Sequence, residues 1–412
     1  MSVSLFFHAP KSKPSHGTAS GSTNRPYCHS PTMEAIESLL EWATSRGVVL
    51  DGIGPKPLPG RGIGIVATRA VKEGEVVLSV PTALLRSLGN TPKPIVRALK
   101  GATVHAILAA SLCLESEPEF DVWRAVLPSL EDVSAGMPIC WPSELQALLP
   151  AAASAMLAKQ QAKFDTDWAL VSAAFPDDST HARLTRDGFL YAWNLVNSRT
   201  FYHTTPRTEK LHKDDHMVLQ PVADLFNHAP RGSCSVAYDA AGFTMVALRA
   251  HAPGDELSIQ YGAHSNDFLL VEYGFALPRD ANPWDETGLD AYVCPLFAPA
   301  QRRRLEAAGF WAGYVLDAQT ACYRTQTALR LLCVSPAQWR AVLDGTRDED
   351  LDAPAVDAEL LRVLRRYEKD VRARVAEVER SAAGSDATRG LLRARWIQIK
   401  ELVVAAISRI QD

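Results

Sequence analysis

The chain has 412 residues, of which 47% are hydrophobic and 22% are charged, as is ordinary for a globular protein of two or three domains. Its formal net charge of -4 provides no basic field, so we expect no nucleic-acid partner. No apolar run approaches the length that spans a bilayer, and we expect no membrane partner. The seven cysteines show no zinc-ligand spacing, so we predict reduced thiols and no metal site.

Residues 1–31 carry no acidic side chain and are rich in Ser, Thr, Pro, Gly and His. Such a segment buries too little apolar surface to pack, and we expect a disordered tail. Organelle transit peptides are also acid-poor and Ser-rich. We expect a cytoplasmic or nuclear protein, with the chloroplast or mitochondrion as the alternative if the tail is an address. We also expect a monomer.

The predicted elements begin after this tail. Thr32 suits a helix N-cap and Gly47 a helix end, so a helix is predicted between them. Glycines then punctuate a loop, and residues 65–67 and 76–80 are typical of short strands.

Residues from about 95 to 195 have Ala and Leu at helical spacing and predict a helical region. Strand character returns at 234–238 and 243–248, which flank a turn and indicate a hairpin, and again at 256–261. In the last third, two apolar stripes step by three and four residues. They predict an antiparallel pair of helices.

Two segments come first as candidates for chemistry. Residues 60–65 read GRGIGI, and their glycines let a backbone approach a nucleotide-like cofactor. The spacing matches neither the dinucleotide fingerprint nor the phosphate loop, so a simple turn is the alternative. In 196–201 a polar cluster follows an apolar helix, and a helix cap is the alternative there.

Two further segments carry polar groups in apolar surroundings. Asp224 and Asn227 lie three apart within 221–228 and need partners, which an amino-acid head group, a ribose or an adenine edge would supply. His228 has no companion ligand at coordinating spacing, which argues against a metal or nuclease site. Tyr261 ends a predicted strand beside a glycine, and Tyr273 follows it; a core tyrosine is the alternative.

In this order the four segments resemble the SET-domain protein methyltransferases, in particular the split-SET branch that includes the Rubisco large-subunit lysine methyltransferases. The resemblance covers about residues 33–280. It implies an α+β fold: a SET-domain β-fold with a threaded, knot-like core, a helical insertion and an all-α C-terminal lobe. The implied divisions are a tail (1–31), the N-terminal part of the SET domain (32–95), the insertion (96–190), the C-terminal part of the SET domain (191–285) and a helical substrate-binding lobe (286–412).

The same resemblance implies roles for single residues. Tyr261 matches the family's catalytic tyrosine, and Tyr273 and Phe275 would line the channel for the target residue. The cofactor would be S-adenosylmethionine. The residues implied to bind it are Arg61, Gly62, Ile63, Ser198, Arg199, Phe201, Asp224, Asn227 and His228.

The implied reaction is methyl transfer to a lysine of a non-histone protein, such as a ribosomal protein, an elongation factor or Rubisco. The lysine must arrive neutral, and desolvation in a narrow apolar channel lowers the pKa of an amine. A protein-histidine methyltransferase on the same scaffold is one alternative, and a catalytically silent interaction module is another. The chain departs from the family in having Ala229 where many members have Ser, and in lacking the cysteine-rich tail of histone-type enzymes.

Overall fold

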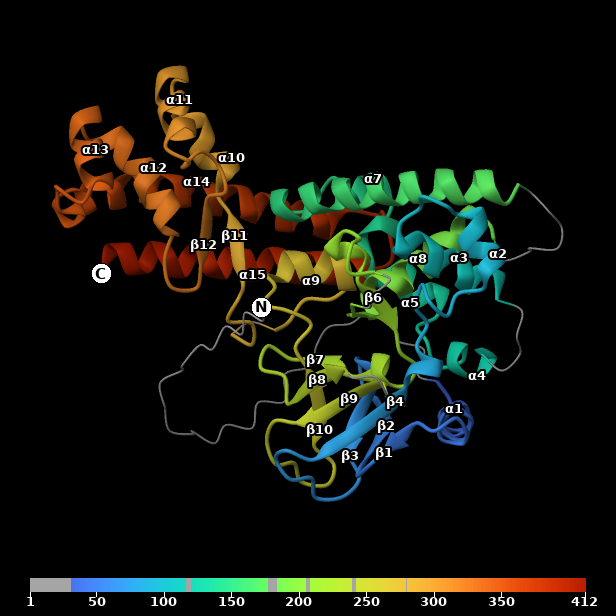
Figure 1. The fold of residues 1–412 in the computed structure, drawn as a ribbon. Coiled ribbons are helices and arrows are strands. Elements are labelled where there is room, and N and C mark those ends of the chain that lie inside the picture. Colours follow the sequence, from blue (N-terminus) through green and yellow to red (C-terminus); the bar gives the residue numbers. More distant parts are fainter. Residues whose placement is uncertain (1–30, 116–119, 177–183, 205–207, 239–241, 279) are drawn as a thin grey trace.

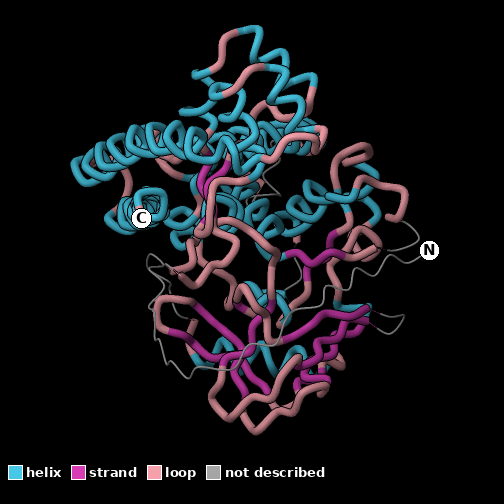
Figure 2. Tube along the Cα trace, turned by 90° about the vertical axis from the view of Figure 1, so that its left-hand side faces the viewer, coloured by secondary structure: helices cyan, strands magenta, loops and turns pink. Residues whose placement is uncertain are grey.

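The computed structural model describes residues 31–115, 120–176, 184–204, 208–238, 242–278 and 280–412. Most strands lie together in the lower half of Figure 1, and the long helices cross its upper half. Figure 2 shows the same division from the side. The predicted tail lies almost wholly outside the described residues. Within the described ranges, no helix is long and apolar enough to cross a membrane.

Two four-stranded sheets form the strand-rich region, with the orders β1–β4–β9–β8 and β2–β3–β10–β7. The predicted hairpin is confirmed, because β8 and β9 pair antiparallel with Cys234 opposite Ala247. The strands are Val49–Leu50 (β1), Ile53–Leu58 (β2), Gly62–Ala67 (β3), Val76–Pro81 (β4), Asn227–His228 (β7), Cys234–Tyr238 (β8), Gly242–Ala247 (β9) and Glu256–Ile259 (β10).

Strand β2 corrects the expectation of a loop in this segment. It pairs along its whole length with β3, starting with Ile53 opposite Ala67, although it contains Pro55 and Pro57. Proline lacks a backbone donor and is tolerated on an edge strand, and β2 is the outer strand of its sheet. The two prolines and the neighbouring glycines are typical of loops, so the sequence pattern predicted a loop here and not a strand.

Strand β7 runs parallel to β10, with Asn227 opposite Ser258 and His228 opposite Ile259. A parallel pair needs a long connection between its strands, and here the β8–β9 hairpin lies in that connection. The pairing brings the segment with Asn227 and His228 beside the strand that leads to Tyr261.

The first half of the chain is otherwise helical. The first helix is confirmed: the Thr32 hydroxyl accepts a hydrogen bond from the Ala35 N–H at 3.2 Å, and Gly47 follows the helix with a φ of 88°. The helices are Met33–Ser45 (α1), Lys93–Ala98 (α2), Val104–Leu114 (α3), Asp121–Arg124 (α4), Leu130–Gly136 (α5), Ser143–Gln146 (α6), Ala151–Ala174 (α7) and Arg186–Arg199 (α8). Short 3₁₀ helices lie at Thr82–Leu84, Pro138–Cys140, Lys213–Asp215, Ala223–Leu225, Cys294–Leu296 and Glu349–Asp352.

The C-terminal half holds the predicted antiparallel helix pair, α14 and α15, which run side by side in Figure 1. Two two-stranded sheets, β5–β6 and β11–β12, were not predicted; their strands are only three residues long. The elements are Thr200–Tyr202 (β5), Met217–Leu219 (β6), Asn266–Tyr273 (α9), Glu286–Gly288 (β11), Asp290–Val293 (α10), Pro299–Ala307 (α11), Val315–Asp317 (β12), Tyr323–Cys333 (α12), Pro336–Leu343 (α13), Ala353–Arg380 (α14) and Asp386–Gln411 (α15).

Two large hydrophobic cores support these regions, and helix α7 contributes to both. Its first half places Ala153 and Leu157 in the core of the C-terminal helices. Its second half places Phe164 and Val171 in the core beneath the sheets. Apolar burial contributes roughly 25 cal/mol for each Å² removed from water. Because α7 buries apolar side chains in both cores, the hydrophobic effect holds the two regions together.

Candidate active site

Two hollows meet between the sheets and the helical insertion. The first is walled by residues 61–63, α5 and α8. The second lies beside β5 and β8. They share a wall, which is formed by Ser198, Arg199, Asp224, Tyr261 and Tyr273. All five residues are among those singled out from the sequence.

The glycine segment borders the first hollow where β3 begins. Arg61, Gly62 and Ile63 all line the hollow, and Gly62 has a φ of 70°, which favours glycine. A Cβ on Gly64 would lie 2.8 Å from the Asn227 amide nitrogen, so the strand and Asn227 approach each other only because this position is a glycine.

Asn227 is held in place by two acceptors. Its side-chain nitrogen donates to the carbonyl oxygen of Ile63 at 3.2 Å and to Oε1 of Glu256 at 3.1 Å. Glu256 also pairs with the Arg61 guanidinium. One carboxylate therefore fixes both Asn227 and Arg61, and it was not among the residues predicted for the site.

Tyr261 is fixed at both its backbone and its hydroxyl. Its N–H donates to Nδ1 of His228 at 3.0 Å, and its hydroxyl donates to the carbonyl oxygen of Phe226 at 2.8 Å. Because Nδ1 of His228 accepts, a neutral His228 carries its proton on Nε2. His228 is buried and is not among the described residues that line either hollow. Its ring contacts those of Tyr261 and Phe275, with centroids 5.1 Å and 6.1 Å away.

Aromatic rings surround the junction of the two hollows. The ring centroids of Tyr261 and Tyr273 are 5.0 Å apart, and those of Tyr273 and Phe275 are 6.4 Å apart. Burial, together with nearby Tyr261 and Glu272, raises the pKa of Tyr273, so its hydroxyl stays protonated at neutral pH. We call the space beside the rings of Tyr261, Tyr273 and Phe275 the aromatic passage, and these three side chains are uncharged.

Asp224 is a buried carboxylate in the shared wall. Its Oδ2 accepts from the Trp123 indole at 3.2 Å and lies 3.4 Å from Nη1 of Arg199. Burial raises the pKa of Asp224, while Arg199 opposes that shift. The turn before it is strained, because Val222 is a β-branched residue with a φ of 76°. The structure therefore maintains this ion pair at an energetic cost.

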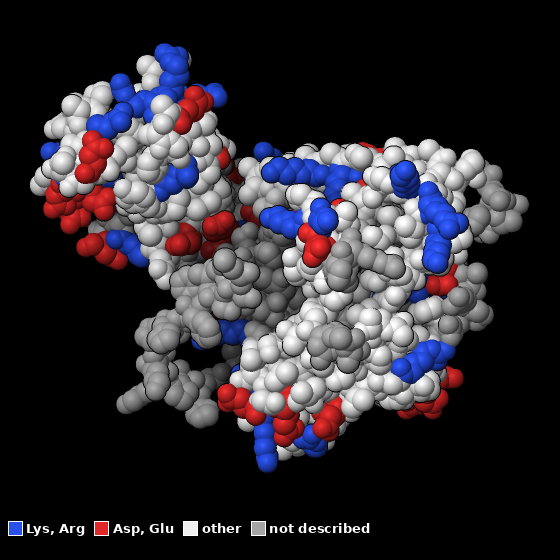
Figure 3. Space-filling model, viewed as in Figure 1, with Lys and Arg blue, Asp and Glu red and all other residues white. Residues whose placement is uncertain are grey.

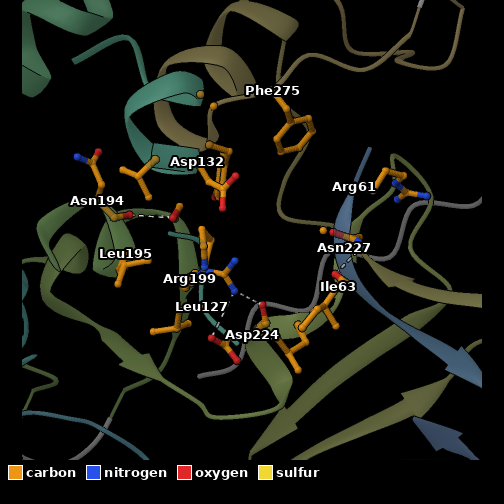
Figure 4. A pocket seen from close by; sticks show the side chains of 18 of the residues that line it. Arg61, Ile63, Leu127, Asp132, Asn194, Leu195, Arg199, Asp224, Asn227 and Phe275 are labelled. Carbon is orange, nitrogen blue, oxygen red and sulfur yellow. Dashed lines mark hydrogen bonds and ion pairs between the residues drawn. The ribbon is translucent and has the colours of Figure 1, made fainter. Parts of the chain in front are cut away.

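Helix α5 supplies a wall of the first hollow that sequence reasoning missed. Asp132, Val133 and Gly136 line it, and in Figure 4 the Asp132 side chain extends into the hollow on the side of Arg199. Oδ2 of Asp132 accepts from the Ser129 N–H at 3.0 Å and from its hydroxyl at 2.8 Å, which completes a capping box. The capping box fixes where α5 begins, but it carries no information about the place of the helix beside the hollow.

The end of α9 is clamped to two other helices. The Asn197 amide donates to Oε2 of Glu272 at 2.8 Å, and the Gln160 amide donates to the same oxygen at 3.0 Å. Glu272 precedes Tyr273, and Asn197 precedes Ser198. These bonds therefore fix the ends of α8 and α9 on either side of the shared wall.

Phe201 is, with His228, one of the two residues implied to bind cofactor that do not line the first hollow. It follows α8 in strand β5 and lines the second hollow, and it is absent from the described wall of the first. Ser198 lines both hollows, and its hydroxyl donates to the Asn194 carbonyl oxygen at 2.8 Å. In the part of the chain that the structure describes, no cluster of His, Cys, Asp and Glu is suited to a metal ion.

Comparison with known proteins decides the family. Residues 62–262 match the SET domain, and residues 285–408 match the Ribosomal lysine N-methyltransferase 2 C-terminal domain. The chain belongs to the SET-domain protein methyltransferases. It is an S-adenosylmethionine-dependent protein N-methyltransferase.

Curated relatives cover most of this SET-domain chain. SET domain-containing protein 4 of Mus musculus is 29% identical over 76% of this chain and 76% of its own length. Ribosomal lysine N-methyltransferase set11 of Schizosaccharomyces pombe is 25% identical over 80% and 86%. Actin-histidine N-methyltransferase of Drosophila melanogaster is 26% identical over 60% and 50%.

A solved structure bears out the expected α+β SET fold with its C-terminal helical region. The structure of Rubisco LSMT bound to AdoMet superposes with a TM-score of 0.61 at 18% identity, covering 92% of this chain and 91% of that chain.

Proposed function

We propose that this enzyme transfers a methyl group from S-adenosylmethionine to a lysine side chain of a non-histone protein. The observation that carries the proposal is the meeting of two hollows at one aromatic wall, formed by Tyr261 and Tyr273. A cofactor in the first hollow and an acceptor in the second would meet there, as a direct transfer requires.

The residues of the first hollow fit this cofactor. Gly62 has left-handed backbone, and a Cβ on Gly64 would lie 2.8 Å from the Asn227 amide nitrogen, so these glycines leave backbone open to a flat adenosine. Asp132 and Arg199 offer opposite charges to the amino-acid end, and Phe275 offers an apolar surface. We assign Asp132 to cofactor binding, together with Arg61, Gly62, Ile63, Ser198, Arg199, Asp224 and Asn227. Phe201 is assigned to the second hollow. His228 acts through its hydrogen bond to Tyr261.

The bound cofactor supplies an electrophilic methyl group on its sulfonium. The chain supplies the surroundings of the acceptor amine. An amine that enters an apolar, aromatic passage loses its hydration, which lowers its pKa and favours the neutral nucleophile. The Tyr273 hydroxyl, kept protonated by burial, adds no negative charge that would hold the amine in its cationic form.

Tyr261 acts by orientation. Its hydroxyl is bonded to the Phe226 carbonyl and its N–H to His228, so the ring has a single position beside the passage. Alignment of reactants contributes up to about 7–11 kcal/mol in favourable cases, and a fixed phenol and neighbouring carbonyls add directional CH···O contacts. We therefore assign Tyr261 to the alignment of the methyl group.

Lysine is favoured over histidine as the acceptor by the C-terminal domain. The matching family is named for a ribosomal lysine methyltransferase, and the set11 relative spans 80% of this chain, against 60% for the actin-histidine relative. A ribosomal protein is the substrate that these names suggest, with an elongation factor or Rubisco as further candidates. The substrate would be held by the helical lobe, 286–412, and this division of the chain stays a prediction. The monomeric state and the compartment also stay predictions.

Label transfer tests the proposal. The protein is incubated with methyl-labelled S-adenosylmethionine and a cell lysate, and the labelled residue is identified by mass spectrometry. We expect label on a lysine of a non-histone protein. Label on histidine would support the alternative chemistry. The absence of both label transfer and cofactor binding would refute the proposal that the protein is a methyltransferase.

A further inference from the structure

The second hollow offers almost no net charge to an incoming ligand. Among the described residues of its wall, Arg199 and Asp224 are the only charged ones. They lie in the wall shared with the first hollow and pair with each other, and the Asp224 side chain is fully buried. Their opposite charges leave the hollow without a local excess of either sign.

Large apolar side chains stand exposed around the same hollow. The exposed fractions are 66% for Tyr202, 51% for Leu248 and 39% for Val236. They come from β5, from the residue after β9 and from β8, so three separate segments contribute to one surface. Figure 3 shows mostly white residues over β8 and β9. Exposed apolar side chains that gather in one place mark a binding surface.

The apolar character continues inward. Phe201, Phe226 and Tyr238 line the same hollow as this rim and Tyr261. Tyr238 is fixed by the Gln220 amide, which donates to its hydroxyl at 2.9 Å. The rim and the aromatic wall therefore form a continuous surface that leads to the passage.

We infer that the second hollow binds an acceptor segment whose side chains next to the lysine are apolar and uncharged. The inference rests on the proposed function, which assigns the first hollow to the cofactor and leaves the second for the acceptor. Its continuity with Tyr261 identifies the occupant as the substrate segment. Basic residues on either side of the lysine, as in a histone tail, would find one carboxylate among the described residues that line the hollow. That carboxylate is Asp224, which is buried and paired with Arg199.

Peptides with one central lysine test this directly. Three peptides of equal length carry apolar, acidic or basic residues on both sides of that lysine, and compensating charges at their ends equalise their net charge. We expect kcat/KM to be higher by about tenfold or more for the apolar flanks, in line with the selectivity of apolar pockets. Equal or higher kcat/KM for either charged peptide would overturn the inference.

Two substitutions locate the effect on the surface. Leu248→Glu places a charge at the rim, and Leu170→Glu places one on the exposed face of α7, where Leu170 is 45% exposed. We expect Leu248→Glu to raise KM for the apolar peptide by about tenfold with kcat and cofactor affinity unchanged, and Leu170→Glu to leave KM unchanged. An unchanged KM in Leu248→Glu would overturn the inference.

Cofactor binding separates the two proposals. If S-adenosylmethionine does not bind and no lysate protein is labelled, the proposed function fails. If cofactor binds and lysate protein is labelled on lysine, but no apolar-flanked peptide is preferred, only the inference about the acceptor segment fails.

Discussion

The rings of Tyr261 and Tyr273 lie 5.0 Å apart, with 35° between their planes, in the wall shared by the two hollows. Tyr261 follows strand β10, and Tyr273 ends helix α9. The passage therefore depends on how a strand of the SET core and a helix joined to the C-terminal core are held against each other.

Replacing Asp132 with Asn should weaken S-adenosylmethionine binding. The carboxylate faces a hollow assigned to a cofactor whose amino-acid end carries an ammonium, and the loss of one charge interaction costs about 1 kcal/mol, roughly fivefold in Kd. Titration calorimetry measures the Kd. The demethylated product keeps the ammonium of the amino-acid end, so its Kd should rise by a similar factor.

Ser129→Ala is the matched control for this substitution. It breaks the same capping box but keeps the Asp132 charge. If Ser129→Ala weakens cofactor binding as much as Asp132→Asn does, the effect comes from the fold of α5, and Asp132 has no direct part in binding.

Arg395→Met should strongly destabilise the protein. Arg395 is fully buried and donates to Asp267 at 2.7 Å and to Asp285 at 2.8 Å, which joins α15 to α9 and to the segment before β11. Loss of one partner leaves Asp267 buried without its cation, which costs about 3–5 kcal/mol. Urea unfolding measures this loss.

Arg372→Met provides the comparison for Arg395. Arg372 pairs with Glu368 on the exposed side of α14, and such pairs contribute about 1 kcal/mol or less. A loss in Arg395→Met that is no larger than in Arg372→Met would contradict the role assigned to the buried cluster.

His105 should make the free energy of unfolding depend on pH. Burial lowers the pKa of His105 from 6.5 to about 3, and its Nε2 lies 2.9 Å from the Trp193 carbonyl oxygen. A base with a lowered pKa is neutral in the fold, so its contribution is complete above 6.5 and is lost as the pH falls toward 3. The slope from one such group is about 1.4 kcal/mol per pH unit.

His105→Gln removes this titration. Unfolding free energies measured by urea at pH 7 and pH 5 should fall less in the variant than in the wild type. Parallel losses in the two proteins would show that His105 does not titrate as its burial implies. Because α3 packs on α8, which carries Ser198 and Arg199, the loss of stability at low pH should also affect the position of these two residues.

The sequence identified those parts of the site that lie in short, contiguous patterns. Glycines near 62, the pair Asn227 and His228, and a tyrosine after a strand are recognisable because their chemistry is local. Which of the two hollows the Phe201 side chain faces could not be recognised from the sequence. Side chains of a strand alternate between faces, and the face depends on how β5 pairs with β6, which sequence spacing leaves open.

Long-range packing explains the other omissions. Helix α5 reaches the first hollow because two glycines let the chains touch: a Cβ on Gly136 would lie 3.2 Å from the Gly274 carbonyl oxygen. Glu256 binds Asn227 and Arg61 through a sheet register that is fixed by pairing of β10 with both β3 and β7. Neither contact has a local sequence signature. Strand β2 had no recognisable strand pattern because its two prolines are tolerated only at the edge of a sheet.

The most direct test of the central claim is a paired measurement on Tyr261→Phe. Methyl transfer to lysate protein and the Kd for S-adenosylmethionine are measured on the variant and on the wild type. The arrangement of the two hollows predicts that transfer falls about 100-fold, as on loss of one positioned polar group, while the Kd stays within about twofold. Transfer at the wild-type rate, with the Kd unchanged, would contradict the assignment of Tyr261 to the methyl-transfer passage.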